Sequence, residues 1–176
     1  PRNPKESFFS EGAGMRAGIA GTLIGILTLI AFYLGMIHNG GVIPLTDVKY
    51  FETKEGIEVL TYGRTMAFIV LTFSQLFYSL SMRNSKKTIF EVGFFGNKML
   101  ILSIIVGIAL QVGLISIPPI SAVFKVTQMD SSHWGMVIGL SLIPLIVNEI
   151  IKNKFEGWEI SIELDFDVLQ NKFKII

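Results

Sequence analysis

Four long stretches of the sequence contain no charged side chain. They cover residues 17–37, 65–82, 99–124 and 131–148. The first has 21 residues, and a helix of that length is about 30 Å long, the thickness of the hydrocarbon core of a bilayer. Almost no polar stripe recurs every three or four residues, as it would in a helix that covers a soluble core. The pattern therefore predicts four helices that cross a membrane.

Two adjacent prolines shorten the third stretch. Pro118 and Pro119 lack backbone donors and disfavour a helical conformation in the residue before them, so this helix is expected to end near Ser116 or Ile117. The fold class expected is all-α integral membrane, with four transmembrane helices in an up-down bundle. The spans are expected at about 15–37, 64–82, 98–117 and 132–152.

Two segments outside the spans show β-like patterns. The connection over residues 38–63 has two short β-rich runs around residues 54–56, which favours a small outer hairpin. In residues 158–168 apolar and polar side chains alternate, which is the period of a strand. Such a strand must pair with another region, lie on the membrane surface or stay disordered. The chain would thus divide into a membrane domain, 1–154, and a tail, 155–176.

The composition supports a lipid surrounding. Hydrophobic residues make up 51% of the chain and charged residues only 16%, and the mean hydropathy is +0.58. A soluble domain normally carries about 25% charged residues, so the expected partner of this surface is the lipid bilayer. The formal net charge of +1 gives no sign of a nucleic-acid partner. The chain has no cysteine, which excludes disulfides and zinc-thiolate sites.

The basic residues around the spans predict the orientation, because cytoplasmic flanks carry more Lys and Arg. One side has nine of them: Arg2, Lys5, Arg16, Arg83, Lys86, Lys87, Lys98, Lys152 and Lys154. The opposite side has four: Lys49, Lys54, Arg64 and Lys125. We therefore expect an integral protein of the cell membrane with both termini, and the tail, in the cytoplasm.

The second span contains the polar side chains that point most directly to chemistry. Thr72, Gln75 and Ser79 share one helical face, and Gln75 falls near the middle of the bilayer. A primary amide that faced lipid would leave its hydrogen-bonding atoms unsatisfied at a cost of a few kcal/mol. Gln75 should therefore face a bundle interior or a wet cavity. It could form an interhelical hydrogen bond or supply an oxygen ligand to a hard cation such as calcium.

Other polar residues cluster near the ends of the spans. Asn148 and Glu149 lie at the cytoplasmic end of the fourth span, and Glu149 can pair with Lys152 three residues later, which favours a stabilising contact over a proton relay. His38 and His133 both fall at the outer interface. Single histidines at such places are more often polar interfacial groups than metal ligands.

The first span has a face of small residues, Ala17, Gly21 and Gly25, spaced four apart. In lipid such a face lets another helix approach closely, so we assign it to packing. The sequence contains no phosphate loop, no nucleophilic triad and no dinucleotide fingerprint. We therefore expect no catalytic residue and no cofactor site in this chain itself.

Several strings, taken in order, resemble one family: the carboxy-terminal transmembrane domain, helices seven to ten, of P-type cation-transporting ATPases of the sarcoplasmic-reticulum calcium-pump type. The strings are PRNPKE at 1–6, RTMAF at 64–68, QLF at 75–77, Asn97, Pro118-Pro119, Phe124-Lys125, Trp134 and IPLIVNEIIK at 143–152. The resemblance covers about residues 1–153. Because residue 1 is a proline and no signal-peptide pattern follows it, we expect a piece of a longer chain.

The resemblance implies a support domain that braces the ion-binding helices of a pump. Its partners would be the upstream transport helices and the cytoplasmic domains, which would hold the phosphorylated aspartate and use ATP and Mg to transport calcium. In the two-ion pumps of the family a glutamate that binds one ion matches Gln75, so the amide suits fewer calcium ions per cycle or a different cation. The position that matches Asn148 is also commonly acidic.

A second hypothesis belongs to another class of protein. The four helices could form a free-standing membrane scaffold that recruits a partner through the alternating pattern of residues 158–168. An upstream Asp-Lys-Thr-Gly-Thr phosphorylation motif in the longer gene product would favour the pump, whereas an initiator methionine directly before Pro1 would favour the scaffold.

Overall fold

The computed structural model describes residues 13–40, 49–84 and 87–173, and the side chains of residues 17–40, 49–84 and 87–153. Every regular element in this described part is a helix. The elements are α1 (Ala13–Gly40), η2 (Tyr50–Glu52), α2 (Lys54–Ser81), α3 (Ile89–Val92), η3 (Phe94–Gly96), α4 (Lys98–Ser116), α5 (Pro118–Phe124) and α6 (Ser131–Phe173).

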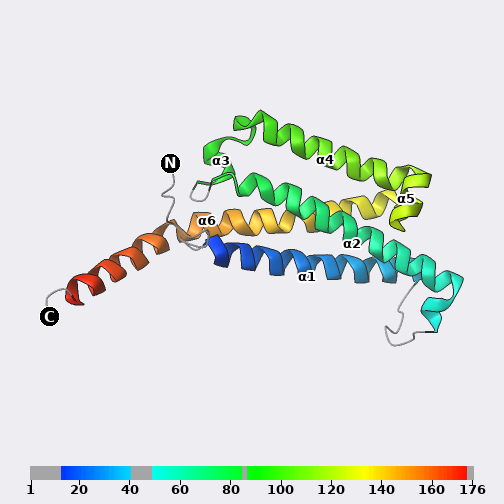
Figure 1. Cartoon of the computed structure of the whole chain (residues 1–176), viewed down its shortest axis with the longest axis horizontal. Helices are drawn as coiled ribbons and strands as arrows, with labels where there is room; N and C mark the ends of the chain where they lie inside the picture. The colour runs from blue at the N-terminus through cyan, green and yellow to red at the C-terminus, as the bar shows by residue number, and fades with distance from the viewer. Residues whose placement is uncertain (1–12, 41–48, 85–86, 174–176) are drawn as a thin grey trace.

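Four of these helices are long and apolar enough to cross a membrane. The qualifying segments are Ala17–Gly40, Lys54–Ser81, Lys98–Ser116 and Ser131–Asn153. They confirm the all-α class and the four predicted helices. The second helix is longer than predicted, because it begins at Lys54 rather than near residue 64. Figure 1 shows the four helices side by side, with short elements at their ends.

The ends of α4 follow the signals in the sequence. The side chain of Asn97 caps its start by accepting a hydrogen bond from the backbone N–H of Leu100 at 3.1 Å. The helix stops at Ser116, Ile117 is extended, and Pro118 opens α5 at a position where a missing backbone donor costs nothing. The predicted effect of the two prolines is confirmed.

The core is built around α2, which packs against α1, α6 and α4. Buried side chains from all four long helices form one cluster, including Leu27 of α1, Met66 and Ile69 of α2, Ile115 of α4 and Val137 of α6. As a result, three sides of α2 are covered by other helices, and its fourth side is left open.

The backbones of α1 and α2 come close together near the predicted outer side. A Cβ atom added to Gly35 would lie 2.8 Å from the Cα atom of Gly63, and one added to Gly63 would lie 2.8 Å from the carbonyl oxygen of Phe32. Only glycine fits at both positions. The backbones therefore touch at this pair of glycines and not at the glycines of the first half of α1.

The predicted hairpin in the outer connection is wrong. Residues 41–48 lie outside the described part, but η2 and the first turns of α2 occupy residues 50–63, where the second half of the hairpin was expected. Thr53 caps α2 by accepting a hydrogen bond from the backbone N–H of Gly56 at 3.1 Å. Val59 then packs against Met36 of α1. This cap and this packing favour a helix over the short β-rich runs.

The strand expected over residues 158–168 is also wrong, because α6 continues to Phe173. Figure 1 shows this extension leading away from the other helices. A lone strand leaves its backbone groups without partners, whereas a helix satisfies them within the segment. The alternation of apolar and polar residues therefore did not set the secondary structure here.

Candidate functional site

Gln75 lies in α2 with its side chain exposed on the surface of the described domain. Leu71, one turn before Gln75, and Met82, two turns after it, are exposed as well. Arg64, Leu71, Gln75 and Met82 are spaced by seven, four and seven residues, so they form a single stripe along the helix. We call these four residues the open stripe of α2. It is the fourth side of α2, the one that α1, α4 and α6 leave uncovered.

The two hydroxyl residues predicted to accompany Gln75 are turned to their own helix. Thr72 donates a hydrogen bond to the carbonyl oxygen of Phe68 at 2.9 Å, and Ser79 donates one to that of Leu76 at 2.6 Å. Both side chains are half-buried. Each hydroxyl proton is therefore in use, but a hydroxyl oxygen can still accept or coordinate. Gln75 is the most accessible of the three.

The small-residue face of α1 is also uncovered. A Cβ atom added to Gly18, Gly21 or Gly25 would meet no atom within 4 Å, and Gly21 and Gly25 are exposed. Within the described chain this face therefore packs against nothing. The prediction that it receives a helix from elsewhere stays a prediction.

A buried polar cluster joins α2, α3 and α6 at the end of the domain that was predicted to be cytoplasmic. Glu149 is 9% exposed, and its Oε2 atom accepts from the backbone N–H of Ile89 at 2.7 Å. Its Oε1 atom accepts from the hydroxyl of Ser81 and from Lys152, the latter at 3.0 Å. Asn148 donates from Nδ2 to the Ser81 hydroxyl at 2.6 Å. Both predicted residues, Asn148 and Glu149, belong to this cluster.

The predicted ion pair of Glu149 with Lys152 is confirmed. Both side chains are buried, whereas the sequence suggested a pair at the membrane interface. Lys152 is 6% exposed and also donates to the carbonyl oxygens of Ser81 and Lys87. Every oxygen of the Glu149 carboxylate thus has a protein donor, which suits a structural contact better than an ion ligand. Ser81 lies six positions after Gln75 in α2, about 9 Å along the helix, so Gln75 and the Glu149 cluster do not form one site.

At the opposite end the structure brings together side chains that the sequence left apart. The rings of His38 and His133 have centroids 4.7 Å apart. The Tyr62 hydroxyl is hydrogen-bonded to Nδ1 of His133 and accepts from the backbone N–H of Asp130 at 3.3 Å. This cluster links the end of α1 to the starts of α2 and α6. In the described part of the chain, no three His, Cys, Asp or Glu residues are grouped so that they could hold a metal ion.

Sequence reasoning missed a buried amide in α4. Gln111 is 5% exposed, and its Nε2 atom has no hydrogen-bond partner among the described residues. The hydroxyl of Ser74 in α2 is fully buried and also has no hydrogen-bond partner among the described residues. The signal was available for Gln111, because an amide inside an apolar span is costly wherever it lies.

Comparison with known proteins finds relatives of which this chain matches only a C-terminal part. A family model described as the C-terminus of cation-transporting ATPases matches residues 1–153. The chain is 44% identical to a calcium-transporting ATPase 1 of Bacillus cereus over 86% of its length, and 30% identical to a calcium-transporting ATPase of Bacillus subtilis over 88%. It is 28% identical to calcium-transporting ATPase type 2C member 2 of Mus musculus over 86%. These matches cover only 17%, 16% and 14% of the three relatives.

Proposed function

The chain belongs to the family of cation-transporting ATPases, whose C-terminal part it matches over residues 1–153, and from this premise we propose that it is the membrane support domain of an ATP-driven calcium pump. In this proposal residues 1–154 brace the ion-binding helices, and residues 155–176 form a cytoplasmic tail. The upstream part of the longer protein carries the phosphorylated aspartate and the nucleotide site. ATP and Mg therefore act there, and calcium is the transported ion.

The observation that carries the proposal is the exposure of Gln75 on the open stripe of α2. An amide inside a span does not face lipid without losing several kcal/mol of hydrogen bonding. Because α1, α4 and α6 cover the other sides of α2, the open stripe is the side on which the upstream transport helices pack. This position brings the amide oxygen of Gln75 to the edge of the ion path, where it serves as a neutral ligand.

The uncovered glycines of α1 support the same arrangement. Gly18, Gly21 and Gly25 leave space for an approaching helix, and close packing is the main force that holds helices together in lipid. The identities to proteins named as calcium-transporting ATPases support calcium as the ion. The distribution of Lys and Arg supports a cell-membrane protein with both termini in the cytoplasm.

The test replaces Gln75 in the full-length pump with Ala, Glu and Leu. Phosphorylation from ATP is then measured as a function of calcium concentration. Gln75→Leu should weaken the apparent calcium affinity about tenfold or more, since it removes the oxygen and leaves the neighbouring ligands incomplete. Gln75→Glu should change the affinity and its pH dependence, because it adds a charge to the ion path.

A matched control is Gln128→Leu, which removes an exposed amide between α5 and α6, outside the spans. This variant should leave the calcium dependence unchanged. Unchanged affinity in all three Gln75 variants would reduce Gln75 to a packing residue. Loss of phosphorylation at every calcium concentration, with the protein still folded, would indicate that the open stripe serves assembly rather than ion binding.

A further inference from the structure

The connection between α2 and α4 exposes large apolar side chains next to free lysines. Phe90 is 91% exposed, Phe95 is 72% exposed and Met99 is 72% exposed. Lys87 and Lys98 are exposed as well, and their ammonium groups have no ion-pair or hydrogen-bond partner in the part of the chain that is described. These residues belong to the stretch 87–99, which contains α3 and η3 and is called the 87–99 segment below. An apolar surface of this kind on a folded protein usually marks a contact with another phase or molecule.

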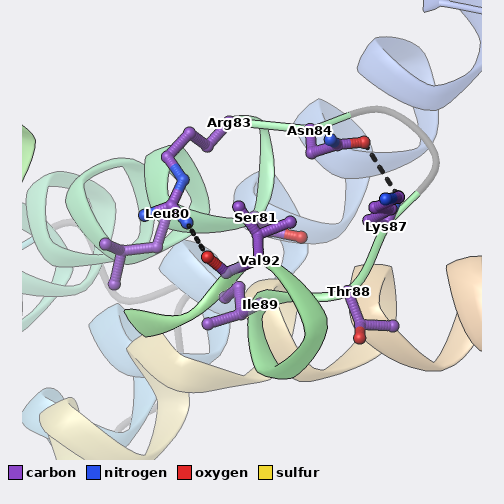
Figure 2. Close-up of a pocket in the computed structure, with 8 residues that line it drawn as sticks. All are labelled: Leu80, Ser81, Arg83, Asn84, Lys87, Thr88, Ile89 and Val92. Atoms are coloured by element: carbon purple, nitrogen blue, oxygen red, sulfur yellow. Dashed lines mark hydrogen bonds between the residues drawn. The ribbon is translucent and has the colours of Figure 1, made fainter. Parts of the chain in front are cut away.

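The exposure of these rings is fixed by the fold. The backbone N–H of Ile89 donates to buried Glu149, and the Ile89 side chain is buried beside Leu80 and Ile104. Arg83 donates to the carbonyl oxygen of Val92 at 3.3 Å (Figure 2). It also donates to that of Gly93 at 2.7 Å. One side of α3 is therefore held against the bundle, and Phe90 on its other side points away.

A turn after α3 presents the second aromatic group. Gly93 has a φ of 81°, a backbone conformation that residues other than glycine rarely adopt. Phe94 and Phe95 of η3 follow, with 47% and 72% of their surfaces exposed. Glu91 is the acidic residue of the segment, and its Oε2 atom accepts from the backbone N–H of Thr88 at 2.8 Å. The two lysines therefore dominate the free charge of this surface.

The depth of the segment points to the membrane boundary. The span in α2 ends at Ser81 and the span in α4 begins at Lys98, so the residues between them lie where both helices leave the hydrocarbon. Figure 1 shows α3 between these two helix ends. The exposed apolar surface then continues along α4 at Leu102, Ile105 and Leu110, which are 53%, 57% and 70% exposed.

We propose that the 87–99 segment is an interfacial anchor that binds anionic phospholipid headgroups through Lys87 and Lys98. The rings of Phe90 and Phe95 lie at the boundary between headgroups and acyl chains, where Phe, Trp and Leu side chains of interfacial segments are buried. The ammonium groups reach the phosphates above them, and each lysine near an anionic surface strengthens binding about fivefold. The proposed orientation places the anchor in the inner leaflet, but binding itself does not depend on which leaflet is involved.

The test uses the full-length protein with a single cysteine introduced by Phe94→Cys and labelled with an environment-sensitive fluorophore. The protein is reconstituted in phosphatidylcholine vesicles that contain a minor fraction of either brominated phosphatidylcholine or brominated phosphatidylglycerol. Both lipids should quench the fluorescence, and the phosphatidylglycerol should do so several-fold more effectively at equal mole fraction. Raising the salt concentration should reduce this preference, because it screens exposed charges.

Three variants separate headgroup binding from simple burial. The Lys87→Gln, Lys98→Gln double variant should lose the preference for phosphatidylglycerol while quenching by phosphatidylcholine persists. The Lys87→Arg, Lys98→Arg variant should keep it. Lys125→Gln removes an exposed lysine directly after α5, far along the chain from the 87–99 segment. This variant should also keep the preference for phosphatidylglycerol. The substituted lysines are exposed, so thermal unfolding should show an intact fold in each case.

Three results would overturn the anchor. Absence of quenching by both lipids would mean that protein covers the segment. Equal quenching by the two lipids would mean that no headgroup is selected. Loss of the preference on adding millimolar inorganic phosphate would identify a phosphate site rather than a lipid site. None of these results depends on calcium, so a failure here is distinguishable from a failure of the proposed pump function.

Discussion

The carboxylate of Glu149 in α6 accepts a hydrogen bond from the backbone N–H of Ile89, with 2.7 Å between Oε2 and N. This contact ties the short α3 to the long α6, while the other carboxylate oxygen binds Ser81 and Lys152. A single buried side chain thus ties α6 to α2 and α3, whose contacting residues lie 68 and 60 positions earlier in the sequence. The cluster sets the position of the 87–99 segment, and it lies apart from Gln75.

Glu149→Ala should strongly destabilise the domain. It leaves the Lys152 ammonium group buried without its counter-charge, and breaking a buried pair in this way costs about 3–5 kcal/mol. Thermal unfolding of the full-length protein in detergent should show a lower transition temperature. The matched control is Glu58→Ala, because Glu58 is exposed on α2 and should change the transition very little.

A second substitution tests the cause of that loss. Adding Lys152→Met to Glu149→Ala removes the unpaired charge, so part of the lost stability should return. If the double variant unfolds at a lower temperature than Glu149→Ala alone, the cost does not arise from the unpaired lysine. If Glu149→Ala unfolds like Glu58→Ala, the cluster contributes no stability.

Gly63→Ala should destabilise the contact between α1 and α2. The new Cβ atom would lie 2.8 Å from the carbonyl oxygen of Phe32 and 2.9 Å from Cγ of Met36, and overpacking of this kind costs about 1–3 kcal/mol. Gly113→Ala in α4 is the control, because a Cβ atom there meets nothing within 4 Å. Thermal unfolding of both variants checks the difference. A Gly63 variant as stable as the Gly113 variant would show that the two helices can separate without cost.

Tyr62→Phe should weaken the cluster of Tyr62, His38 and His133. The substitution removes the partner of the His133 ring and of the Asp130 backbone N–H, and a buried group left unpaired costs about 1–3 kcal/mol. Tyr33→Phe is the control, since the Tyr33 side chain is 43% exposed in α1. Chemical denaturation of the detergent-solubilised protein measures both. Equal stability of the two variants would mean that water replaces the lost hydroxyl.

The sequence by itself determined the number of long helices, their apolar character and the end of α4. Each of these properties depends on local chemistry: the length and apolar character of an uncharged run, and the missing donor of Pro118. The pairing of Glu149 with Lys152 was predictable for the same reason, because three residues of helix bring the two side chains together.

Only the tertiary structure decided which polar groups meet and which faces stay open. Ser81 and the Ile89 backbone reach Glu149 from positions 68 and 60 residues away, and no local pattern encodes such distances. The open stripe with Gln75 exists because three helices cover the other sides of α2. The hairpin was predicted from β-rich runs and the terminal strand from a period of two. Both predictions were wrong because these patterns describe side chains alone, whereas a strand also needs a neighbour for its backbone hydrogen bonds.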